Sequence, residues 1–351
     1  MRFAAAPEYQ VFPTRERPLK PYQAAVRAAR ETAALVREVD PELVVSDILT
    51  VAGGLAAELE GRPWATLVPH LLPTPEAGFA PYSSGARLPR TRAGRALWRG
   101  LDSVTLIGAR RGREELNGAR ARLGLGPLAH VHGGISRRLA LVGTFPQLEY
   151  PRAVWPSGAR VTGPLLWERE APPAAEPEGE APLVLVAPST SQDPGDRLLN
   201  AALEGLASEP VRVLAVAARR VPARVPANAR VVEWMSYAQA MPLADAVVCH
   251  AGHGTLVRAL ASGAPVVACP VAGDMAENAA RVAWVGAGVS LPRRLASARG
   301  VRLAVRRVLG EPSYARRAGV LGDWARSHDG AALAADAVEE AASGAPLSAP
   351  A

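Results

Sequence analysis

Short apolar runs alternate with amphipathic segments along most of the chain. Runs such as 43–45, 65–68 and 183–187 have the length and composition of buried strands. Between such runs, segments such as 24–39 place apolar residues at the spacing of a helix with one buried face. Strands that alternate with helices in this way are typical of parallel sheets covered by helices. The pattern therefore predicts an α/β fold.

The runs fall into two groups separated by a segment with linker composition. Residues 168–182 contain two adjacent prolines and alternating Glu and Ala. We therefore expect an N-terminal domain at 1–167, a linker at 168–182, a C-terminal domain at 183–340 and a disordered tail at 341–351. The expected strands are 43–47, 65–70, 139–144, 161–164, 183–188, 211–217, 230–234, 247–249 and 266–270. The expected helices are 24–39, 52–59, 92–123 (with Trp98 in the core), 197–207, 237–243, 276–285, 295–309 and 314–340, the last placed to pack back across the linker.

The stretch 247–288 concentrates the chemistry of the chain. An apolar strand ends at His250, and a loop with Gly252 and Gly254 leads into a helix that Thr255 could cap. Backbone N–H groups at a helix N-terminus bind anions, and glycines let the main chain approach a phosphate closely. His250 would then lie at the carboxyl end of a parallel strand, where it could contact a diphosphate. The competing interpretation is a tight turn in which the histidine only caps backbone groups.

A metal site is a second interpretation of the same loop. Cys249, His250 and His253 are all possible ligands, but adjacent strand residues point to opposite faces of a sheet. Cys249 and His250 therefore do not converge easily on one ion, and we expect no metal. Cys249 and Cys269 are expected to be small core residues in a reducing compartment.

A second strand end follows, where Gly273 and Asp274 open the next helix. His250 and Asp274 should therefore face one cleft. The order strand, glycine loop, helix, strand, Asp loop, helix resembles the nucleotide-sugar signature of the UDP-dependent glycosyltransferase family, especially its bacterial macrolide-glycosyltransferase branch. The resemblance implies the GT-B fold, two facing Rossmann-like doubly wound domains that bind the sugar donor in the second domain and the acceptor in the first.

The resemblance also implies individual roles in donor binding. Trp234 would lie against the nucleobase, Asp274 would bind sugar hydroxyls, and Asn278 would fix the phosphate or the loop. Met275 stands where the family commonly has Gln, so one sugar contact is expected to be lost. Arg258 stands where many members have a Glu that binds the ribose diol, which leaves UDP-sugars and dTDP-sugars both open. The other expected donor-binding residues are Ser189, Thr190, His250, Gly252, His253, Gly254 and Thr255; for the hydroxyl cluster at 189–191, plain N-capping is the competing interpretation.

Asp47 follows an early strand and could simply cap the next helix. The resemblance implies instead that it orients a catalytic histidine that takes a proton from the acceptor. No histidine precedes His70 in this chain. We therefore expect an N-terminal domain that lacks the family's first strand and catalytic-histidine segment. His70 is the only nearby substitute base; alternatively it caps a turn, or it lines an acceptor pocket with Phe79 and Tyr82 of the proline-rich loop 73–89.

Charge and composition narrow the remaining function classes. Lys and Arg number 40 against 33 Asp and Glu, a net charge of +7, but the basic residues are scattered rather than grouped with aromatic residues. We therefore expect no nucleic-acid binding. The sequence has no apolar run of about 18 residues and no basic-then-apolar N-terminus, so neither a transmembrane helix nor a signal peptide is expected. A cytoplasmic protein is the expectation.

These features and the resemblance together predict an enzyme without cofactor. It would be an inverting, metal-independent glycosyltransferase that moves a sugar from a UDP- or dTDP-sugar to a hydroxyl of a small apolar acceptor of phenolic, polyketide or terpenoid type. The helix terminus at Thr255 and the side chain of His250 would neutralise the leaving diphosphate in place of a metal. Two alternatives stay open: a nucleotide-sugar epimerase of the same fold, and a non-catalytic nucleotide-sugar-binding protein.

Overall fold

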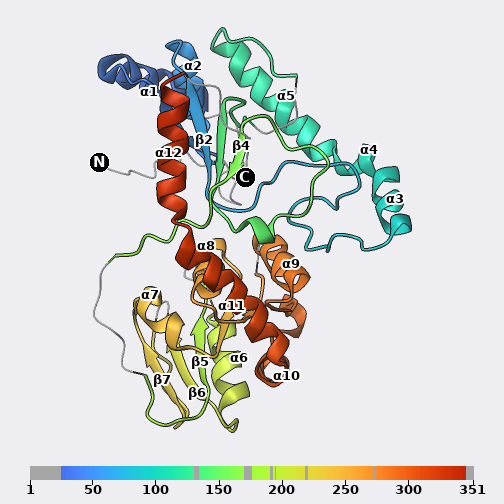
Figure 1. The fold of residues 1–351 in the computed structure, drawn as a ribbon, viewed down its shortest axis with the longest axis vertical. Coiled ribbons are helices and arrows are strands. Elements are labelled where there is room, and N and C mark those ends of the chain that lie inside the picture. The colour runs from blue at the N-terminus through green and yellow to red at the C-terminus, as the bar shows by residue number, and fades with distance from the viewer. Residues whose placement is uncertain are drawn as a thin grey trace.

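The computed structural model describes residues 25–129, 134–169, 176–189, 193, 195–217, 220–271 and 273–344. Two parallel sheets are formed, one in the upper and one in the lower half of Figure 1. Helices cover both sheets, so the predicted α/β class is confirmed. Residues 1–24 of the expected N-terminal domain, Thr190, and residues 345–351 of the expected tail lie outside the described residues.

The first sheet has the strand order β1-β2-β3-β4. Its faces carry different partners, because successive strand residues point to opposite sides. Ala65, Leu139 and Leu141 pack against the last helix of the chain, whereas Ala140 and Val142 face the other side of the sheet. The strands and the helices packed beside them are β1 (Val44–Asp47), β2 (Trp64–Val68), β3 (Leu139–Val142), β4 (Ala159–Val161), α1 (Ala25–Val39), α2 (Ala52–Leu59) and α12 (Gly330–Ala342).

The second sheet has the strand order β10-β9-β8-β5-β6-β7. From β5 the chain first adds β6 and β7 on one side, and then crosses over to add β8, β9 and β10 on the other side. Every residue of β5 and β8 is buried, as expected for parallel strands covered on both faces. Val184 and Val186 face one core cluster and Leu183 and Leu185 the other. The strands are β5 (Leu183–Ala187), β6 (Arg212–Val216), β7 (Ala229–Val232), β8 (Ala246–Cys249), β9 (Val266–Ala268) and β10 (Gly288–Ser290). The helices of this half are α6 (Arg197–Leu206), α7 (Tyr237–Ala240), α8 (His253–Ala261), α9 (Met275–Val285), α10 (Ala298–Gly310) and α11 (Pro312–Ser327).

The predicted helix 92–123 is wrong in detail. It is divided into α3 (Arg92–Gly100), α4 (Asp102–Thr105) and α5 (Ile107–Arg122). No residue of α3 is buried, and the helix projects from the side of the molecule (Figure 1). Trp98 is only half-buried and is not a core residue, since its helix packs no face against the sheet.

Two helix starts in the C-terminal half also differ from the prediction, and both are set by caps. α10 begins at Ala298 rather than at 295, because the Ser297 side chain accepts a hydrogen bond from Gly300 N. The segment 314–340 is broken where Asp329 accepts from the N–H groups of Ala331 and Ala332. That break turns the chain into α12, which lies against the first sheet although it follows the second in the chain.

The chain passes between the two halves twice, and the two passages touch. One is the segment that follows β4, and the other is the junction of α11 and α12. A Cβ on Gly330 would lie 2.6 Å from the carbonyl oxygen of Pro164, and one on Gly163, at φ +106°, would lie 2.9 Å from the Trp324 ring. Ala341, where the tail was expected to begin, is fully buried in α12.

The packing of α6 on α10 gives a prediction. A Cβ on Gly205 would lie 2.2 Å from the carbonyl oxygen of Ala298, so Gly205→Ala should destabilise the protein by about 1–3 kcal/mol despite the better helix propensity of alanine. Gly118→Ala in α5 is the matched control: a Cβ there meets nothing within 4 Å, so it should stabilise by about 0.5–1 kcal/mol. Denaturant unfolding measures both changes, and a Gly205→Ala variant as stable as the control would contradict the packing argument.

Candidate functional site

The loop between β8 and α8 forms a sharp turn into a helix N-terminus. Ala251 adopts φ +63°, a conformation that costs free energy in a residue with a side chain. This turn lets α8 begin at His253 with Gly252 as its N-cap. Thr255 therefore lies inside the first turn, and its predicted role as the cap is wrong. Half-exposed Thr255 and exposed Gly254 face outward from the same turn.

His250 lies over this loop. Its Nδ1 is 3.2 Å from the carbonyl oxygen of Ala187, which can only accept, so Nδ1 carries a proton. A Cβ on Gly252 would lie 2.3 Å from His250 Nε2, so a side chain at position 252 would collide with the ring. Burial lowers the pKa of His250, while Ala187, Asp274 and Asp193 act to raise it. An anion beside Nε2 would favour the imidazolium, which donates from both nitrogens.

His253 joins the two halves of the molecule. Its Nε2 lies 3.1 Å from the carbonyl oxygen of Gly143, which directly follows β3. Burial lowers the pKa of His253 to about 4, so the ring is neutral near pH 7 and donates from Nε2. The side chain therefore points into the first half, and only the backbone N–H of His253 is left for an anion at the helix start.

The two strand ends predicted to share a cleft do lie together. Asn278, fully buried in α9, donates from Nδ2 to the carbonyl oxygen of Ala251 at 2.9 Å and to Asp274 Oδ2 at 3.2 Å. It thereby joins the loop after β8 to the residue that precedes α9. Met275 is half-buried and packs against the core of the second half. A negative group at the start of α8 would lie beside Asp274.

The other residues expected at the donor site are less closely joined. Ser189 is buried after β5, and Trp234 follows the edge strand β7 with 53 % of its surface exposed. Arg258 points to the start of the linker, where it donates to the carbonyl oxygen of Leu166, just before the linker, at 2.7 Å and pairs with Glu168 at 3.4 Å. An exposed indole suits stacking on a base, whereas the guanidinium of Arg258 is held by protein groups.

The first sheet contributes His70, which follows β2. Its Nδ1 lies 2.7 Å from the carbonyl oxygen of Leu71, so that nitrogen carries the proton and Nε2 has the lone pair. The charge of His70 lowers the pKa of His253, which places the two rings in the same region. Tyr82 approaches His70 Nδ1 at 3.4 Å. His70 thus presents a proton acceptor where the two halves meet.

Phe79 and Tyr82 line a small cavity that both halves share. Phe79 packs edge-on against Tyr150, with 5.8 Å between ring centroids. The far wall includes Glu277 and Arg281 of α9. Two predicted acceptor-pocket residues, Phe79 and Tyr82, therefore line one cavity with the donor-side helix, and His70 adjoins Tyr82, with 6.3 Å between their ring centroids.

Asp47 is engaged locally at the end of β1. Its Oδ1 accepts from Leu49 N at 2.7 Å, which closes a turn. Among the described residues this is the hydrogen bond that its carboxylate makes. The helix that follows, α2, has Val51 as its N-cap and no side-chain cap, so the interpretation that Asp47 caps that helix is wrong. A part in orienting a histidine stays a prediction.

Sequence reasoning missed a buried ionic cluster beside this site. It contains Glu149, Glu277 and Arg281, with side chains at most 5 % exposed. The pairing of Glu277 with Arg281 at 2.8 Å has a sequence signal, since the two residues are four apart on a helix. Glu149 has none, because it follows a strand of another domain by several residues and meets Arg281 only in the fold.

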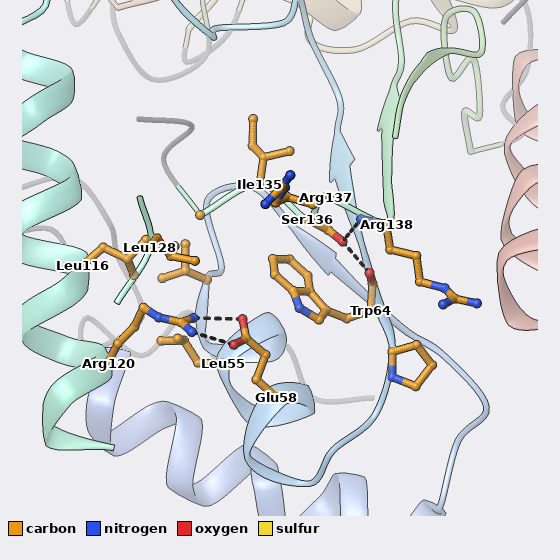
Figure 2. Close-up of a pocket in the computed structure, with 13 residues that line it drawn as sticks. Leu55, Glu58, Trp64, Leu116, Arg120, Leu128, Ile135, Ser136, Arg137 and Arg138 are labelled. Carbon is orange, nitrogen blue, oxygen red and sulfur yellow. Dashed lines mark hydrogen bonds and ion pairs between the residues drawn. The ribbon is translucent and has the colours of Figure 1, made fainter. Parts of the chain in front are cut away.

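A second cavity of about 310 Å³ lies at the opposite edge of the first sheet. Figure 2 shows Trp64, the first residue of β2, at its centre and the paired side chains of Arg120 and Glu58 on one wall. The amino ends of strands form this edge, whereas His70 follows a carboxyl end. This cavity is therefore separate from the site described above.

In the described part of the chain, no cluster of three or more His, Cys, Asp or Glu residues has the arrangement to hold a metal ion. Cys249 and Cys269 are both buried and unpaired by a disulfide, and burial raises the pKa of the Cys249 thiol to about 12. Among the same residues no helix is long and apolar enough to span a bilayer.

Comparison with known proteins places this geometry in context. Residues 197–338 match the family model of the Erythromycin biosynthesis protein CIII-like C-terminal domain. The 4'-demethylrebeccamycin synthase of Lentzea aerocolonigenes is 32% identical over 318 residues, which are 87% of this chain and 75% of that protein.

Solved structures of similar fold are glycosyltransferases. The glycotransferase of kitacinnamycin superposes with a TM-score of 0.70 at 22% identity, over 92% of this chain and 81% of that one. Glycosyltransferase VinC, solved in complex with dTDP, gives 0.65 at 19% identity, over 91% and 80% of the two chains. At these identities the superpositions establish the fold, which is the GT-B arrangement expected from the sequence.

The buried state of His253 predicts a pH dependence of stability. Its folded pKa of about 4 lies below the ordinary value of 6.5, so the unfolded chain binds the proton more readily as the pH falls from 6.5 towards 4. This residue should therefore cost the protein up to about 2–3 kcal/mol of stability over that interval. His253→Gln keeps a donor for Gly143 and should flatten that part of the profile, measured by urea unfolding at several pH values. His328→Gln on the surface is the control, and identical profiles for the two variants would contradict the prediction.

Proposed function

This chain belongs to the glycosyltransferase family of 4'-demethylrebeccamycin synthase and the EryCIII-like proteins, and we propose that it transfers a sugar from a nucleoside diphosphate to a hydroxyl of a small apolar acceptor. The observation that carries the proposal is the bond from Asn278 to both Ala251 and Asp274. A diphosphate at the start of α8 would hold its attached sugar beside the Asp274 carboxylate.

The donor half can neutralise a leaving diphosphate without a metal ion. The backbone N–H groups at the start of α8 and the helix dipole provide positive potential, and His250 can add a charge-assisted hydrogen bond from Nε2. Trp234 would stack on the base and Asp274 would accept from sugar hydroxyls. In this proposal, residues of the chain itself stabilise the charge of the leaving diphosphate, as a metal ion does in other enzymes.

His70 is the proposed base. The acceptor hydroxyl loses its proton to His70 Nε2 as its oxygen attacks the anomeric carbon, and the bond from that carbon to the diphosphate oxygen breaks. One displacement of this kind inverts the configuration. The Nδ1 hydrogen bond to Leu71 supports the role, because it leaves the lone pair on Nε2.

The acceptor would enter beside Phe79 and Tyr82. The aromatic rings and the neighbouring Leu72 and Leu88 offer apolar surface to a phenolic or other flat molecule, although the cavity between them, about 20 Å³, would have to widen to admit one. The donor is a UDP- or dTDP-sugar. Arg258 donates to the carbonyls of Leu166 and Trp167 and pairs with Glu168, and its own side chain cannot accept from a ribose diol. We therefore propose that a dTDP-sugar is tolerated.

The first test is sugar transfer by the purified chain, with UDP-glucose or a dTDP-sugar and a panel of phenolic acceptors, followed by mass spectrometry. His70→Gln should lower kcat by about 10²–10⁴-fold and leave the affinity for the nucleoside diphosphate unchanged, because it removes the base alone. His328→Gln on the surface is the control. Full transfer by His70→Gln would exclude His70 as the base. Donor binding without turnover would support a binding protein, and an altered sugar released without acceptor would support an epimerase.

Asp274 gives a separate prediction for the donor. Asp274→Asn keeps the size of the side chain but removes the charge that accepts from sugar hydroxyls, so the KM for the nucleotide sugar should rise about 10-fold. The affinity for the free nucleoside diphosphate, measured by calorimetry, should change less than 2-fold, since that molecule has no sugar at this position. Equal losses for both ligands would show that Asp274 supports the loop rather than the sugar.

A further inference from the structure

Glu149 reaches the ring of His70 through a single peptide group. Leu72 N donates to Glu149 Oε1 at 2.7 Å. The carbonyl of Leu71, which belongs to the same peptide, lies 2.7 Å from His70 Nδ1. In a planar trans peptide the N–H and C=O point in opposite directions, so carboxylate, peptide and imidazole form one continuous series of hydrogen bonds.

The carboxylate of Glu149, the first group of this series, is shielded from water. Glu149 is 5 % exposed, and the residues on either side of it, Leu148 and Tyr150, are also buried. Hydrogen bonds polarise one another in a low dielectric, so a carboxylate on the N–H side makes the carbonyl of the same peptide a stronger acceptor. That carbonyl is the group that holds the proton of the imidazole on Nδ1.

The second oxygen of Glu149 faces the donor half. Arg281 Nη1 lies 3.5 Å from Glu149 Oε2 and donates to the carbonyl oxygen of Leu148 at 2.9 Å. Arg281 Nε donates to Glu277 at 2.8 Å, and the guanidinium lies 3.4 Å from the centroid of the Tyr150 ring. Glu149 is therefore held between the loop that carries His70 and the helix that follows Asp274.

We propose that Glu149 is a positioning residue that sets the tautomer of His70 through the Leu71–Leu72 peptide, and that Arg281 of α9 fixes this carboxylate. The inference rests on the proposed role of His70 as the base. When Nε2 takes the proton of the acceptor hydroxyl, Nδ1 keeps its own proton, and the polarised carbonyl of Leu71 stabilises the imidazolium. No proton moves to Glu149.

Tyr82 cannot take over the role of Glu149 in setting the tautomer of His70. Its hydroxyl is 3.4 Å from both His70 Nδ1 and the carbonyl oxygen of Leu71, which is longer than a strong hydrogen bond. Burial raises the pKa of Tyr82, so the phenol stays neutral and supplies no charge. Glu149 is the anion that acts on this peptide.

The test uses Glu149→Gln, which keeps the shape and an acceptor oxygen but removes the charge. Arg281 retains Glu277 as a partner, so the variant leaves no unpaired buried arginine. Nitrogen-15 NMR of the histidine rings, at a pH where they are neutral, reports which nitrogen carries the proton. In the wild-type protein His70 should be mainly protonated on Nδ1, and in Glu149→Gln a larger share should be protonated on Nε2. The matched control is Glu209→Gln, which removes a carboxylate paired with Arg306 on the surface.

Transfer kinetics give the second readout. Glu149→Gln should lower kcat about 10-fold, with the KM for the donor unchanged, and the double variant Glu149→Gln/His70→Gln should be no slower than His70→Gln alone. Additive losses would indicate a role outside His70 and overturn the proposal, as would an unchanged His70 tautomer. Should Glu149→Gln not fold, Glu149→Asp keeps the charge but shortens its reach to Leu72 N, and the same tautomer shift is expected. The NMR experiment needs no substrate, so it stands even if the wild-type protein transfers no sugar, an outcome that would refute the proposed function instead.

Discussion

The segment from Gly143 to Glu149 is the contact on which the rest of the site depends. It leaves the first sheet after β3, and two helices of the second half bind it, α8 through His253 and α9 through Arg281. Burying a guanidinium and two carboxylates is costly unless each finds partners, so these groups favour one arrangement of the two halves over others of similar packing. An apolar interface of the same area would tolerate sliding much better.

This contact brings together chemistry that neither half holds alone. The second half supplies a helix N-terminus and a histidine, which suit a negatively charged group, and a carboxylate, which can accept hydrogen bonds from hydroxyls. The first half supplies an imidazole whose Nδ1 donates to the carbonyl of Leu71, and a cavity lined with aromatic side chains. Backbone strain is also present here, since Ala251 adopts a left-handed conformation in the loop between β8 and α8.

The sequence predicted the parts of this protein that depend on local patterns. The buried runs at β5, β8 and β9 were recognisable because parallel strands covered on both faces are apolar throughout, and the glycine loop before α8 because few other sequences let a backbone approach an anion. It misjudged Thr255, because the helix start was set by the backbone of Ala251 and Gly252 rather than by the nearest hydroxyl. The prediction for Trp98 was wrong for another reason. An amphipathic pattern shows which face of a helix is apolar, but it does not show whether anything packs against that face. Glu149 could not be found, since its partners are distant in sequence: Leu72 lies in the loop after β2 and Arg281 in α9 of the other half.

The contact of Gly163 with Gly330 has a mechanical consequence. Two well-separated crossings between two bodies would permit rotation about one axis only, the line that joins the crossings. Here the crossings touch, and they can do so because neither residue has a side chain. The touching crossings therefore form one pivot between the halves, and the contacts of His253 and Arg281 with the segment 143–149 hold the halves in the arrangement described.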